Sequence, residues 1–204
     1  MDIDQDELGG PLPLRIWVTR GCFFTLAERL KLKAKYSVIA TTLLSFYVIT
    51  TSLILLAFPD KVSSTNSKWL NALTIVTSIL IIIITLLEHS SNYAKDEECA
   101  ARTARLLAEL YDQVIVSENV DLKLIGKNYA EILRESRVDY DMIDYHSFQI
   151  AHPEAFKHSN FKWVLTVLIF IWEYIKEYWL YAVMAFGPPI FIIKFGMLIF
   201  DGRA

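Results

Sequence analysis

RLKLKAKYSVIATTLL, residues 29–44, passes from alternating basic and apolar residues into residues without charge, and no Gly, Pro or Asn interrupts it. The uncharged stretch continues from Tyr36 to Phe58, and a helix of that length measures about 34 Å at about 1.5 Å per residue. Such a helix can cross a hydrocarbon core of about 30 Å, whereas a helix in a soluble protein is usually shorter and keeps a polar face. The sequence therefore predicts a first membrane span over residues 36–58.

A second uncharged stretch follows at Trp69–Leu87, after a polar turn over residues 59–68 that contains Pro59 and Asp60. Two spans joined by a short turn form a membrane hairpin. The composition agrees, because hydrophobic residues make up 54% of the chain while its charged residues, 21%, are concentrated between the apolar blocks. The pattern is typical of membrane helices attached to a folded aqueous part.

The distribution of Lys and Arg predicts the orientation of the hairpin. Basic residues precede the first span and follow the second, whereas the turn carries only Lys61 and Lys68. The positive-inside rule then places the N-terminus and the residues after Leu87 in the cytosol. The basic residues next to the first span, which we expect to anchor it at the interface, are Arg29, Lys31, Lys33 and Lys35. The acidic start, MDIDQDELGG, is unlike a signal peptide, so the first span is expected to be retained.

Helical periodicity continues outside the spans. The first cytosolic helix has an apolar face of Ile16, Phe23, Leu26, Ala27, Leu30 and Ala34, and no residue that breaks a helix separates it from the first span. The second span likewise continues into a helix with Cys99, Leu106, Leu110 and Val114 on one face, flanked by Leu107 and Tyr111. Two more helices are predicted, over 121–137 with a cap at Asn119 or Asp121, and over 139–150, ending before Pro153.

The predicted fold is therefore an all-α membrane protein, a two-span transmembrane hairpin whose helices extend into a cytosolic helical bundle. Its predicted regions are an N-terminal cytosolic amphipathic helix (1–35), two spans (36–58 and 69–87) joined by a periplasmic turn (59–68), a cytosolic helical region (88–160) and a C-terminal hydrophobic segment (161–204). No stretch alternates as a strand would.

Short motifs in these helices resemble those of the SLATT family. They are A-E-R-L (Ala27 to Leu30), Y-A-E-I-L (Tyr129 to Leu133) and the pair Asp139-Tyr140, and the arrangement is most similar to the subfamily found beside reverse transcriptases. The resemblance implies an oligomeric pore-forming effector of the bacterial inner membrane that acts in abortive-infection defence. It also implies a companion sensor, either a reverse transcriptase or a nucleotide-signalling protein. The alternative is a membrane anchor that recruits a cytosolic partner such as a reverse transcriptase or nucleotide cyclase.

Motifs for catalysis, phosphate binding or zinc binding are lacking in the sequence, so we predict no enzyme and no cofactor. Cys22 and Cys99 are far apart and are expected to be reduced packing thiols. The cluster Asp139, Asp141, Asp144 and His146 could bind a metal only if the side chains converged, and a solvated helix face is favoured. With a net charge of −3, direct binding to nucleic acid is not expected.

Polar residues form a stripe on each predicted span. The stripe on the first span is Ser37, Thr41, Ser45 and Ser52, within an arc of about 80°, and that on the second is Asn71, Thr74, Ser78 and Thr85, within about 60°, with Glu88 near the same line. These residues could line a pore with an acidic mouth, or they could let helices approach closely; helix contact is favoured over lining. Either interpretation requires neighbours, so a homo-oligomer in the bilayer is predicted.

The C-terminal segment carries Glu173, Lys176 and Glu177 within an apolar block, and Gly187-Pro188-Pro189 is expected to break its helix. Basic residues on both sides of the block favour two cytosolic ends. An interfacial or re-entrant arrangement is preferred, with Trp163, Trp172 and Trp179 anchored at headgroup level, and a third span is the alternative.

Overall fold

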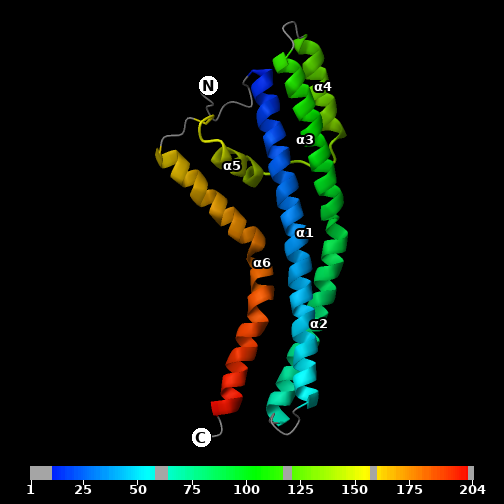
Figure 1. The fold of residues 1–204 in the computed structure, drawn as a ribbon, viewed down its shortest axis with the longest axis vertical. Coiled ribbons are helices and arrows are strands. Elements are labelled where there is room, and N and C mark those ends of the chain that lie inside the picture. The colour runs from blue at the N-terminus through cyan, green and yellow to red at the C-terminus, as the bar shows by residue number, and fades with distance from the viewer. Residues whose placement is uncertain (1–10, 58–63, 117–120, 157–159, 202–204) are drawn as a thin grey trace. The chain divides into compact units, whose positions relative to one another are not determined.

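The computed structural model of the chain describes residues 11–57, 64–116, 121–156 and 160–201. Its helices are α1 (Leu12–Ala57), α2 (Ser64–Ser91), α3 (Tyr93–Val116), α4 (Leu122–Glu135), α5 (Met142–Ala151) and α6 (Asn160–Asp201) (Figure 1). The described residues contain no strand, so the prediction of an all-α fold is confirmed. By length and composition, α1 and the segment Ser67–Leu87 of α2 could each cross a membrane.

The chain divides into two compact units, and α1 and α6 each contain residues of both. The first unit contains Met1–Leu32 and Tyr93–Glu177, and the second contains Lys33–Asn92 and Tyr178–Ala204. α1 runs through the boundary without interruption, as predicted. The predicted continuity of the second span is wrong, because α2 ends at Ser91 and Asn92 adopts φ 47° before α3 begins. Asn tolerates this left-handed conformation better than most residues, which explains a break without Gly or Pro.

The core of the first unit forms where α1 packs with α3 and α4. Its α1 face contains Ile16, Phe23, Leu26, Ala27 and Leu30, as predicted. On α3 the buried positions are Ala100, Thr103, Ala104, Leu107 and Leu110, whereas Cys99 and Leu106 are only half-buried. Of the predicted α3 face, Leu110 and the flanking Leu107 are buried, and Val114 and Tyr111 pack against the core. The prediction missed the small residues Ala100 and Ala104 at the helix contact.

The short helices of the first unit agree with their capping signals. α4 begins after Asp121, whose side chain accepts a hydrogen bond from the Lys123 N–H at 2.9 Å, so the cap at Asp121 is confirmed. The other candidate cap, Asn119, lies outside the described residues. α5 begins at Met142, later than predicted, because Asp141 is its N-cap and Asp144 accepts from the Asp141 N–H at 2.9 Å.

The second unit has buried positions spaced as in a coiled coil. On α1 they are Ser37, Ala40, Leu44 and Thr51, and on α2 they are Leu70, Thr77 and Ile84. Spacings of three, four and seven residues keep one seam of each helix facing its neighbour. α2 already begins at Ser64, so residues 64–68, predicted as turn, are helical.

α6 continues without a break through Gly187-Pro188-Pro189, so the predicted helix end at this motif is wrong. A helix tolerates proline when the carbonyl that loses its N–H donor finds another partner. Here the Tyr47 hydroxyl donates to the Ala185 carbonyl at 3.2 Å. The compensating donor comes from α1, which a local sequence pattern cannot reveal.

Candidate functional site

The hydroxyl groups of the two polar stripes bond within their own helices. In α1 the hydroxyls of Thr41, Ser45 and Ser52 donate to the carbonyls of Ser37, Thr41 and Val48, and in α2 those of Thr74, Ser78 and Thr85 donate to Leu70, Thr74 and Ile81, all at 2.8–3.0 Å. Each donor is therefore satisfied without a neighbouring helix. The hydroxyl oxygens keep lone pairs that a neighbour or water can use.

The stripes differ in how far the second unit covers them. Ser37 is 1% exposed and belongs to the seam, and Thr41, Ser45, Thr74 and Ser78 are half-buried. Ser52, Asn71 and Thr85 are exposed. The side chain of Glu88 lies outside the described residues. Ser52, Asn71 and Thr85 thus present polar atoms on a surface that is otherwise apolar.

Arg29 is the centre of an ion-pair cluster in the first unit that sequence reasoning missed. Its Nε donates to Asp144 Oδ1 and its Nη2 to Asp144 Oδ2, both at 2.8 Å, which is a bidentate pair. Nη2 also donates to Asp141 Oδ2 at 2.9 Å, and Nη1 donates to Glu177 Oε1 at 2.6 Å. One guanidinium therefore joins α1, the start of α5 and α6.

Burial makes this cluster different from a surface ion pair. The side chains of Arg29, Asp144 and Glu177 are 12%, 1% and 15% exposed, whereas that of Asp141 is 72% exposed. Burial raises the pKa of the Asp144 carboxyl, and the Arg29 guanidinium opposes that shift. For Arg29, burial disfavours the charge but the carboxylates outweigh it, so its pKa is raised. Contact between the two groups thus opposes the cost that burial imposes on each charge.

Two sequence interpretations change here. The solvated face predicted for Asp144 is wrong, because that carboxylate is buried against Arg29. Arg29 itself turns into the first unit, so its predicted role at a lipid interface gives way to an internal contact, while anchoring by Lys31, Lys33 and Lys35 stays a prediction.

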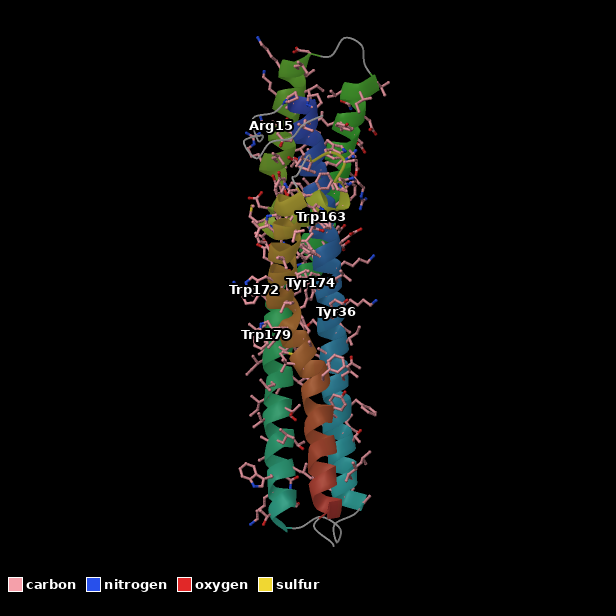
Figure 2. All side chains as sticks on the ribbon, turned by 90° about the vertical axis from the view of Figure 1, so that its left-hand side faces the viewer. Arg15, Tyr36, Trp163, Trp172, Tyr174 and Trp179 are labelled. Carbon is pink, nitrogen blue, oxygen red and sulfur yellow. The ribbon has the colours of Figure 1, made fainter. Side chains whose placement is uncertain are left out.

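The acidic residues within α6 also find partners outside their own helix. Glu173 Oε2 lies 3.2 Å from His146 Nδ1, and Glu177 binds Arg29. The predicted anchors Trp163, Trp172 and Trp179 are 40%, 70% and 54% exposed, and all three lie along α6 (Figure 2).

Cys22 lies next to this cluster and gives a direct test of the packing. Its side chain is fully buried with Phe148 and Phe156, and burial, with a further contribution from the Asp144 charge, raises the pKa of the thiol to about 12. We expect a water-soluble maleimide at neutral pH to modify the half-buried Cys99 and to leave Cys22 unmodified until the protein is denatured. Peptide mass spectrometry of labelled protein measures both sites, and equal labelling of the two thiols in native protein would contradict the packing of α5 on α1.

The structure defines an all-α protein in which two helices are long and apolar enough to cross a membrane. More particularly, the chain belongs to the SMODS and SLOG-associating 2TM effector domain family 5, SLATT_5, whose model matches residues 11–194. The predicted SLATT family is thereby confirmed, and with it a membrane location and a membrane effector role in defence systems; this family is not a known class of enzyme. The subfamily beside reverse transcriptases stays a prediction. No curated protein and no solved structure matches the chain.

Proposed function

We propose that this protein is an oligomeric inner-membrane effector that forms a pore and disrupts membrane integrity when a cytosolic signal arrives, as in abortive infection. The N-terminus and the first unit lie in the cytosol in this proposal. There they receive the signal from a companion, either a reverse transcriptase or a nucleotide-signalling protein. The membrane effector family supports the general role.

The exposed polar atoms of the second unit carry the proposal. Ser52, Asn71 and Thr85 lie on helix surfaces that are otherwise covered by large apolar side chains such as Phe46, Leu53 and Ile82, which suit lipid. A surface of hydroxyl and amide groups gains most when it faces water or another polar surface. Assembly of several hairpins around a common axis would gather these groups along a hydrated lumen.

Thr85→Leu and Ser78→Leu are expected to block conductance without lowering the amount of inserted protein. Leucine suits a lipid-facing helix, so insertion should survive, whereas an apolar ring in a narrow lumen excludes water and closes it. The measurement is single-channel current in planar bilayers, together with the mass of the assembly in mild detergent, where at least about four protomers are needed to enclose a lumen with hairpins. Glu88→Lys should turn a preference for cations toward anions.

Thr42→Leu is the matched control, because Thr42 is exposed on α1 but lies outside the arc of the stripe. Its conductance should equal that of the wild type. Unchanged current in well-inserted, oligomeric Thr85→Leu and Ser78→Leu variants would remove the lining assignment, and loss of the oligomer would make these residues helix contacts instead. A wild-type assembly that never conducts or depolarises cells would favour the anchoring function.

A further inference from the structure

The Ala185 carbonyl of α6 lacks a backbone N–H donor in its own helix. In a helix a carbonyl accepts from the N–H four residues later, or three residues later where the helix tightens. For Ala185 these residues are Pro189 and Pro188, and neither has an N–H. Met184 differs, because Gly187 can still offer an N–H three residues later. The hydrogen bond from the Tyr47 hydroxyl therefore reaches the carbonyl that both prolines leave without a donor.

The surroundings of this hydrogen bond are apolar. Along the described part of α6 in the second unit, Tyr178 is buried and Tyr181, Met184 and Ala185 are half-buried, which places one face against its neighbours. The Tyr178 ring packs edge-on to the Tyr36 ring of α1, with centroids 5.5 Å apart. The exposed positions on the other side are Trp179, Leu180, Ala182, Val183 and Phe186, all of them apolar. A helix lying in a membrane interface needs a polar face for the headgroups and water, and this segment has none.

The length and the direction of residues 178–201 agree with a helix that crosses the membrane. Tyr178–Asp201 forms about 36 Å of helix at about 1.5 Å per residue, enough for a hydrocarbon core of about 30 Å. Within the second unit α6 ends at the same end as α1 (Figure 1), so it runs parallel to the first span.

We propose that residues 178–201 form a third membrane span, held against α1 by the Tyr47–Ala185 hydrogen bond, so that the C-terminus lies on the same side of the membrane as the α1–α2 connection. This third span goes beyond the proposed pore and does not depend on conduction. Basic residues at both ends of the segment give the positive-inside rule little to discriminate, and the earlier spans set the orientation. The alternative that the sequence leaves open is a C-terminal segment that returns to the cytosol. Such a segment needs a turn, and α6 is one helix as far as Asp201.

Labelling of single introduced cysteines in the full-length chain, with its own reactive thiol removed by Cys99→Ser, tests the topology. Spheroplasts carrying Arg203→Cys, Thr65→Cys or Glu118→Cys are treated with a membrane-impermeant maleimide, and unlabelled sites are revealed after lysis. We expect Arg203→Cys to react as Thr65→Cys does, and Glu118→Cys to react only after lysis. Positions 203 and 65 should react alike in either orientation of the hairpin, because a third span places them on the same side of the membrane. Labelling of Arg203→Cys together with Glu118→Cys would overturn the third span.

A double-mutant cycle tests the hydrogen bond itself. Tyr47→Phe removes only the hydroxyl, and Pro189→Ala restores an N–H that can satisfy Ala185 from within α6. We expect Tyr47→Phe to raise the equilibrium constant of unfolding of the wild-type chain by about threefold to about tenfold, a range typical of hydrogen bonds between membrane helices. In the Pro189→Ala chain the increase should be much smaller. Tyr36→Phe serves as a control whose effect should be the same in both backgrounds. An equal effect of Tyr47→Phe in the two backgrounds would show that the hydroxyl does not compensate for the prolines.

Discussion

Substituting alanine for Arg29 is expected to lower the free energy of unfolding of the first unit by about 3–5 kcal/mol, because it leaves a buried carboxylate without its counter-charge. Asp144, 1% exposed, would keep its hydrogen bond from the Asp141 N–H, and Glu177 would lose its ion pair with Arg29 of α1. The loss should appear first as faster amide hydrogen exchange in α5 and in the part of α6 before Tyr178, since Arg29 joins these elements to α1.

Neighbouring variants separate the buried pair from ordinary surface charge. Glu28→Ala changes the adjacent, exposed residue of α1 and should stay within about 0.5 kcal/mol of the wild type. Asp141→Asn removes a carboxylate that is 72% exposed and should cost at most about 1 kcal/mol. Arg29→Lys keeps the charge but cannot form the bidentate pair, so it should fall between wild type and alanine. A cost of Arg29→Ala no larger than that of Glu28→Ala would mean that the cluster does not hold the first unit together.

Asp144→Asn provides the complementary test. The amide oxygen can still accept from the Asp141 N–H, but the buried charge is gone. Arg29→Ala should therefore cost less in the Asp144→Asn chain than in the wild type. Such coupling is expected only if the penalty comes from the uncompensated carboxylate.

The spans and the main core could be predicted because their signals are local. An uncharged stretch of sufficient length predicts a membrane helix without knowledge of any partner, and the apolar face of α1 from Ile16 to Leu30 follows from its periodicity. The family resemblance rested on short motifs in these same helices, and it is confirmed over residues 11–194. The polar stripes also follow from periodicity, but their use depends on how protomers assemble.

Contacts between distant residues could not be predicted in the same way. Arg29 and Asp144 are 115 positions apart, and a basic residue before an apolar stretch resembles a lipid anchor until its partner is known. A partial signal existed, since Asp141 and Asp144 have the spacing of a capping pair at the start of α5. The continuity of α6 through two prolines likewise depends on Tyr47, which lies on another helix.

Gly21 shows the same dependence on tertiary structure, and its substitution is expected to have a large effect on the stability of the first unit. It lies inside α1, where glycine weakens a helix by up to about 1 kcal/mol relative to alanine, so the sequence alone would recommend Gly21→Ala as stabilising. A Cβ at Gly21 would overlap the Phe148 ring of α5, however. Phe148 cannot move aside easily, because Trp17 and His152 pack against it with ring centroids at 4.8 and 4.7 Å.

Gly21→Ala should therefore destabilise the first unit by about 1–3 kcal/mol or more, while Gly126→Ala should stabilise it by up to about 1 kcal/mol. Gly126 is the matched control because it also lies inside a helix, but its added Cβ would meet only Leu12 Cδ2 at 3.9 Å, an ordinary contact. Chemical unfolding in mild detergent measures both variants. Phe148→Leu should recover part of the loss in the Gly21→Ala chain, since a smaller side chain makes room for the methyl group. If both glycine variants proved equally stabilising, α5 would not be packed on α1 at Gly21, and the position of Asp144 beside Arg29 would lose its structural basis.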